Sequence, residues 1–129
     1  MANIITNNAF EERQSFSMSN QGTDCFLELL LCAADDFEKT EHQEELISFL
    51  KDQRSINDIA PGTADFDLAD MPWDENCLIE DIEFLHHAVE AAQTESVITR
   101  MPYEINKEIV LPWLAQFDSM VEQMKQDRD

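Results

Sequence analysis

The chain contains neither proline nor glycine from Thr23 to Ala60, and its apolar residues recur there at intervals of three and four. This spacing lines one face of an α-helix, whereas a half-buried strand alternates apolar and polar residues. Such alternation is not sustained anywhere in the sequence, and glycine occurs only twice. The pattern therefore predicts an all-α fold, a small irregular bundle of roughly four to six helices with one long acidic loop.

Two helices are predicted in the first half of the chain. Thr23 is an N-cap candidate for a helix that continues to about Lys39, and apolar residues cover nearly its whole circumference. A helix that is apolar all round lies at the centre of its domain. Thr40 and Gln43 have the spacing of a capping box, so a second, amphipathic helix is expected over Glu41–Arg54.

A long connection is predicted over residues 55–73, where Pro61, Gly62 and Pro72 are turn and break signals. Loops of this length without regular structure are uncommon and are either functional or disordered. Apolar residues are interspersed among aspartates in this stretch. We therefore expect the connection to pack on the body of the domain.

Two further helical segments follow the connection. Asp74 is placed to cap a helix over Glu75–Gln93, in which apolar residues step by four and three along a narrow seam. The last segment runs from about Tyr103 to Met124 and contains Pro112. A proline inside a helix removes a hydrogen bond and clashes with the preceding turn, so a kink or restart is expected there.

The chain has 129 residues, the size of one domain. We expect residues 1–22 to form an N-terminal arm or a short helix that begins near Asn7 or Asn8, and residues 23–129 to form a single helical domain. The side chains predicted to be nearly fully buried are Leu30, Leu50, Ile82, Leu85 and Phe117.

The charge balance restricts the partners of this chain. Asp and Glu number 28 against 8 Lys and Arg, which gives a formal net charge of −20 and an isoelectric point near 4.1. Direct binding of nucleic acid needs clustered lysine and arginine, and an anionic membrane surface attracts basic segments. We therefore expect neither nucleic acid nor a membrane as a direct ligand.

The cysteines and the N-terminal sequence bear on location. Cys25 and Cys32 lie seven positions apart on a predicted helix, about 10 Å, which is too far for a disulfide. We expect both to be small core residues. The sequence near residue 1 has no basic segment followed by an apolar one, so no signal peptide is expected. No apolar run approaches the length of about 20 residues that is needed to span a bilayer. A reduced, cytoplasmic location is expected.

The acidic residues are unevenly distributed. From Ser55 to Thr99 the sequence has eleven Asp and Glu and no Lys or Arg. Such a stretch is either a solvated face or a recognition surface for a basic partner, in which charge steers association and aromatic residues anchor it. The candidate partner-binding residues are Asp58, Asp65, Phe66, Asp67, Asp70, Trp73, Asp74, Glu75 and Asp81. Among them Phe66 and Trp73 are the expected anchors.

In size, net charge, helical pattern and the Asp-rich segment with Phe66, Trp73 and Asp74, the chain resembles the small, acidic, helical immunity proteins of bacterial toxin–immunity pairs. It is less closely similar to acidic inhibitors that mimic DNA. The resemblance lies in the overall character of the chain and extends over its whole length. It implies a non-enzymatic binding protein, monomeric or homodimeric, that neutralises a basic toxin or nuclease domain.

Catalytic and metal sites are not predicted. Glu83 and His86 form one Glu-x-x-His motif, whereas a ferritin-like di-metal site needs two such motifs and two further glutamates. Cys77 lies roughly 13 Å along the helix from His86, too far for an activated thiol. The histidines are expected at the surface beside neighbouring acids, His42 with Glu38 or Glu41. We therefore expect no enzyme activity, no cofactor and no metal.

Two alternative functions stay open at this point. One is a homodimeric helical bundle that binds a metal or a small ligand. The other is an acidic accessory protein with a solvated surface and no basic partner.

Overall fold

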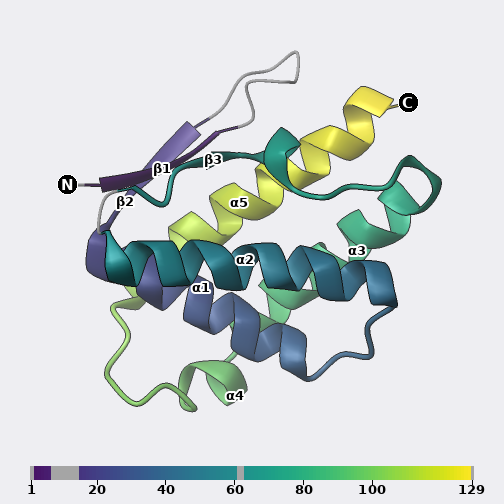
Figure 1. The fold of residues 1–129 in the computed structure, drawn as a ribbon. Coiled ribbons are helices and arrows are strands. Elements are labelled where there is room, and N and C mark those ends of the chain that lie inside the picture. The colour runs from purple at the N-terminus through teal and green to yellow at the C-terminus, as the bar shows by residue number, and fades with distance from the viewer. Residues whose placement is uncertain (1, 7–14, 61–62, 129) are drawn as a thin grey trace.

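The computed structural model describes residues 2–6, 15–60 and 63–128, and it consists of a helical bundle with a small sheet on one side (Figure 1). Its α-helices are α1 (Asn20–Asp35), α2 (Glu41–Ile59), α3 (Leu78–Ala92), α4 (Glu95–Ile98) and α5 (Lys107–Arg128). Its strands are β1 (Ala2–Thr6), β2 (Ser15–Ser19) and β3 (Phe66–Asp67), and β3 is followed by two 3₁₀ turns, η1 (Leu68–Asp70) and η2 (Glu75–Cys77). The predominance of helix confirms the bundle that the apolar spacing predicts.

The sheet corrects the all-α prediction. Its strand order is β2-β1-β3, with β1 antiparallel to β2 and parallel to β3. Ile5 in the central strand stands opposite Phe16 on one side and Phe66 on the other. β1 buries Asn3 and Ile5 and exposes Ile4, so its inward face carries a polar and an apolar residue. A strand this short, with an asparagine among its buried positions, shows no strand periodicity in the sequence.

The first two strands lie in the segment predicted to form an N-terminal arm or a short helix. Ile5 of β1 and Met18 of β2 are each 1% exposed and belong to the same apolar core as the helices. The short helix predicted near Asn7 or Asn8 lies outside the described residues. β1 and β2 therefore contribute side chains to the apolar core.

The starts of α1 and α2 follow local capping rules. α1 begins earlier than predicted, because the Ser19 hydroxyl accepts the backbone N–H of Gly22 at 3.0 Å and so caps the helix. Thr23, the predicted cap, is buried, and its hydroxyl donates to the Ser19 carbonyl instead. α2 begins as predicted, with both bonds of the capping box between Thr40 and Gln43. α2 ends at Ile59, beyond the predicted end at Arg54.

The two later helices carry the predicted apolar faces. The seam on α3 is buried along its length, at Leu78, Ile82, Leu85, Val89 and Ala92. α5 begins later than predicted, at Lys107, and it is one helix through Pro112 rather than two. Beyond the proline the inward face of α5 is buried in the core, at Leu114, Phe117, Met120, Val121 and Met124. This packing holds the helix together despite the bond that the proline removes.

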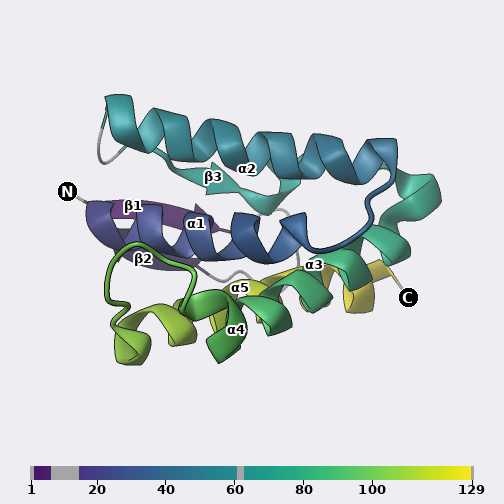
Figure 2. The same ribbon diagram turned by 90° about the horizontal axis from the view of Figure 1, so that it is seen from below.

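Helix α1 lies at the centre of the bundle, as its apolar circumference predicts, and it contacts α2, α3 and α5 (Figure 2). All five predicted core residues are 0% exposed. Phe26 of α1 packs edge to face on Phe117 of α5, with ring centroids 5.5 Å apart. Within the described ranges, no helix combines the length and the apolar character needed to cross a bilayer.

Candidate functional site

Five of the predicted partner-binding carboxylates lie in the connection between α2 and α3, which runs past β3, η1 and η2 (Figure 1). We call the surface they form the acidic face; its residues are Asp65, Asp67, Asp70, Asp74 and Glu75. Three of these side chains are exposed, and those of Asp67 and Asp74 are half-buried. The predicted charged residues are therefore spread along one connection, each at least partly exposed.

Four of these carboxylates are fixed by the backbone. Asp65, Asp67, Asp70 and Asp74 each accept a backbone N–H, at 2.6, 2.9, 3.1 and 2.9 Å respectively. Asp67 is also bonded from a neighbouring strand, because Thr6 Oγ1 donates to its second oxygen at 2.7 Å. Aspartate favours such positions since its short side chain reaches nearby N–H groups. The same bonds shape the connection and hold its negative charges in place.

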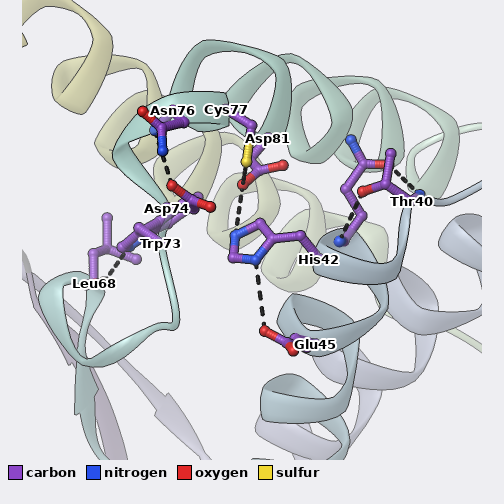
Figure 3. A network of polar contacts seen from close by, with 10 residues as sticks. Thr40, His42, Glu45, Leu68, Trp73, Asp74, Asn76, Cys77 and Asp81 are labelled. Carbon is purple, nitrogen blue, oxygen red and sulfur yellow. Dashed lines mark hydrogen bonds and ion pairs between the residues drawn. The ribbon is translucent and has the colours of Figure 1, made fainter.

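The predicted aromatic anchors are not free side chains. Phe66 is 6% exposed and packs edge to face on Phe49 of α2, with ring centroids 5.3 Å apart, so its assignment as a surface anchor is corrected. Pairing of β3 with β1 turns this residue inward. Trp73 is half-buried, and its Nε1–H donates to the Leu68 carbonyl at 2.6 Å, which closes the turn after β3 (Figure 3).

Two other predicted partner-binding residues lie away from the acidic face. Asp81 is 1% exposed and therefore cannot present its carboxylate at the surface. Asp58 is exposed, but it lines a groove of about 620 Å³ between α1 and α2 together with the basic residues Lys51, Arg54 and Arg100. Its charge therefore faces cations of the same chain.

Asp81 belongs to a cluster that joins the first turn of α2 to the start of α3 (Figure 3). His42 Nε2 and Cys77 Sγ lie 2.9 and 3.6 Å from the same oxygen, Asp81 Oδ2. The other ring nitrogen, His42 Nδ1, faces the Glu45 carboxylate at 3.5 Å. The His42 side chain is 20% exposed and Cys77 is half-buried, so the cluster lies just beneath the surface.

Burial shifts the pKa values of the acidic groups in this cluster. Desolvation raises the pKa of Asp81, against the opposing effect of the neighbouring His42. Desolvation, followed by the charge of Asp81, raises the pKa of the Cys77 thiol to about 11. The thiol is therefore protonated at neutral pH and is not an activated nucleophile.

A second cluster surrounds His86. Its Nε2 lies 2.6 Å from Glu90 on the same helix, and its Nδ1 lies 2.9 Å from Asp118 of α5. Glu122 is also near, at 3.7 Å. The hydrogen bond with Asp118 raises the pKa of His86, against the effect of partial burial. The pairing with Glu90 confirms the predicted pairing with acids of the same helix, whereas α5 adds partners that spacing could not supply.

The pairing of His42 with Asp81 was not predicted from the sequence. Glu38 and Glu41, its neighbours in sequence, were the expected partners of His42. The one local signal was the i,i+4 spacing of Cys77 and Asp81, which places both side chains on the same face of a helix. That His42 meets them depends on how α2 packs against α3.

Comparison of the chain with protein-family models, with curated proteins and with solved structures found no significant match.

Proposed function

We propose that this protein binds a basic protein and neutralises it, in the manner of an immunity protein that blocks a toxin. The observation that supports the proposal is the acidic face, in which four carboxylates of one connection are fixed by backbone N–H groups. No lysine or arginine occurs from Ser55 to Thr99, so the segment supplies no cation of its own to neutralise these charges.

The arrangement suits fast and salt-dependent association. Carboxylates that are already held in place lose little conformational freedom when a partner binds. A surface of one sign raises the rate of encounter with a basic partner. Three cations of the chain gather instead in the groove between α1 and α2, where Arg54 pairs with Asp24 and Arg100 with Asp36.

A nuclease domain is the class of basic partner that fits this surface best. Its substrate groove binds phosphates through lysine and arginine, and fixed carboxylates can take the positions of those phosphates. Because Phe66 is buried, the acidic face has less apolar anchoring than the sequence predicted. Trp73 is the remaining aromatic candidate for contact. We therefore expect affinity to fall steeply as salt is added.

The test is a variant that removes charge and preserves the fold: Asp65→Asn, Asp70→Asn and Asp74→Asn combined. Asparagine caps backbone N–H groups about as well as aspartate, so the connection should keep its shape. The unmodified chain is used to capture proteins from its host at low salt, and the association and dissociation rates of the captured basic protein are then measured. We expect the variant to associate about tenfold more slowly at low salt, with dissociation little changed.

The matched control removes the same number of charges outside the acidic segment, by Asp35→Asn, Glu104→Gln and Glu108→Gln, all at exposed positions. It should associate at nearly the rate of the unmodified chain. Equal slowing in both triple variants, or no slowing in either, would show that the acidic face is only a solvated surface. Neutralisation is tested separately, by whether the protein inhibits the activity of the captured partner.

A further inference from the structure

The cluster of His42, Cys77 and Asp81 joins three different ligand types, an imidazole nitrogen, a thiol sulfur and a carboxylate oxygen. One such atom from each residue lies within 4.8 Å of the other two. The residues come from two helices that are far apart in sequence and meet at this point (Figure 3). This cluster is separate from the acidic face.

Two polar atoms of this cluster are unsatisfied. Within the described residues, His42 Nε2 and Asp81 Oδ1 are buried and lack a hydrogen-bond partner of good geometry, although the Gln43 side chain lies near the Asp81 carboxylate and acts to lower its pKa. His42 Nε2 is 2.9 Å from Asp81 Oδ2, but it is not aligned for a hydrogen bond to it. The Asp81 side chain is 1% exposed, so water cannot freely satisfy its carboxylate. Buried polar atoms without partners are rare, and a bound ion is one of their established causes.

We propose that His42, Cys77 and Asp81 bind a divalent transition-metal ion, with Zn²⁺ as the best fit. Zinc combines nitrogen, sulfur and oxygen ligands in a tetrahedron, with bond lengths that place neighbouring ligand atoms about 3.3–3.6 Å apart. The sulfur-to-oxygen separation of 3.6 Å lies in this range, and the nitrogen-to-oxygen separation of 2.9 Å is a few tenths of an ångström shorter. The nitrogen and the sulfur lie within 4.8 Å of each other, and a tetrahedral ion would bring this separation into the same range.

The surroundings of the three ligands support a cation. Glu45 faces His42 Nδ1 at 3.5 Å and can hold the ring proton there, which leaves Nε2 as the metal ligand. Metal binding would release the Cys77 proton to solvent and place the positive charge between a thiolate and a carboxylate. Three protein ligands leave one tetrahedral position for water, which half-buried Cys77 leaves within reach of solvent. The ion would tie the first turn of α2 to the start of α3.

The cluster around His86 is a weaker candidate and serves as the comparison site. Its ligand atoms belong to His86, Asp118 and Glu122, and it contains no sulfur. His86 already has close partners on both ring nitrogens, at 2.6 and 2.9 Å, and its side chain is 34% exposed. The His86 cluster is therefore more exposed than the cluster of His42, and both of its other ligands are carboxylates.

The test uses Co²⁺ as a spectroscopic probe for zinc. The metal-free protein is titrated with Co²⁺, and the thiolate-to-cobalt charge-transfer absorption and the visible bands of tetrahedral cobalt are recorded. Surface carboxylates cannot give a thiolate band, so the many acids of this chain do not interfere. We expect saturation at about one Co²⁺ per chain, loss of the bands when excess Zn²⁺ is added, and about tenfold weaker binding in Glu45→Gln.

Matched variants assign the ligands. Cys77→Ser should abolish the thiolate band, whereas Cys32→Ser, which changes another half-buried cysteine, and His86→Ala should keep it. Absence of the band in the unmodified chain, or its persistence in Cys77→Ser, would overturn the proposal. The unmodified chain provides a second measurement that needs no variant: Zn²⁺ should slow alkylation of Cys77 about tenfold and leave that of Cys32 nearly unchanged. Equal alkylation of Cys77 with and without Zn²⁺ would also refute the site.

Discussion

Replacing Asn3 by alanine should destabilise the whole domain, although the residue lies near one end of the sheet. Asn3 is 0% exposed. Its Nδ2 donates to Thr23 Oγ1 at 2.8 Å and to Asn57 Oδ1 at 2.9 Å, and its Oδ1 accepts the backbone N–H of Ala64 at 2.8 Å. One side chain therefore joins β1 to α1, to α2 and to the residue that precedes Asp65 of the acidic face.

The expected loss in the free energy of unfolding follows from the hydrogen-bonding groups that Asn3→Ala leaves unpaired. Thr23 keeps its own bond to the Ser19 carbonyl, so it loses only an accepted bond. The amide oxygen of Asn57 and the N–H of Ala64 lose a buried partner, and each such loss costs about 1–3 kcal/mol. The free energy of unfolding should therefore fall by about 3 kcal/mol, and the melting temperature of a domain this size by about 10 °C.

Urea denaturation followed by far-ultraviolet circular dichroism measures this change. The matched control is Asn76→Ala, which removes an exposed asparagine and should alter the free energy of unfolding by less than about 0.5 kcal/mol. If Asn3→Ala lowers the free energy of unfolding no more than Asn76→Ala, then water replaces the buried hydrogen bonds and Asn3 does not hold these elements together.

Three further changes have defined outcomes. Leu85→Ala, at a core position that is 0% exposed, should lower the free energy of unfolding by about 2–5 kcal/mol in the same assay, and a loss under about 0.5 kcal/mol would place Leu85 outside the core. Gly22→Ala should destabilise by about 1–3 kcal/mol, because a Cβ there would lie 2.4 Å from the Trp113 ring; a gain in stability would show that the ring moves aside. The bond to Asp118 raises the pKa of His86, so its stabilisation is complete below the ordinary histidine pKa of about 6.5 and is lost as pH rises through the raised value. The stability difference between the unmodified chain and His86→Ala should shrink over that rise, and a difference independent of pH would contradict the ion pair.

The helical part of the fold was predictable because its signals are local. The apolar seam of α3 and the capping box at Thr40 depend on residues within a turn or two of one another, and both are confirmed. β1 gave no such signal, since its buried face contains Asn3, whose amide is satisfied only by residues of α1, α2 and the connection. A buried polar residue in a strand can be recognised only when the distant residues that satisfy its hydrogen bonds are known.

The sequence alone determined that the chain folds as a helical bundle, which side chains form its core, and that acids without compensating cations cluster between Ser55 and Thr99. The tertiary structure decided which of those acids face solvent. Asp74 and Asp81 look alike in the sequence, yet Asp74 is partly exposed and caps η2, whereas Asp81 is buried against His42. The difference arises from the packing of α2 on α3, and such packing depends on contacts between residues distant in sequence, which periodicity does not encode.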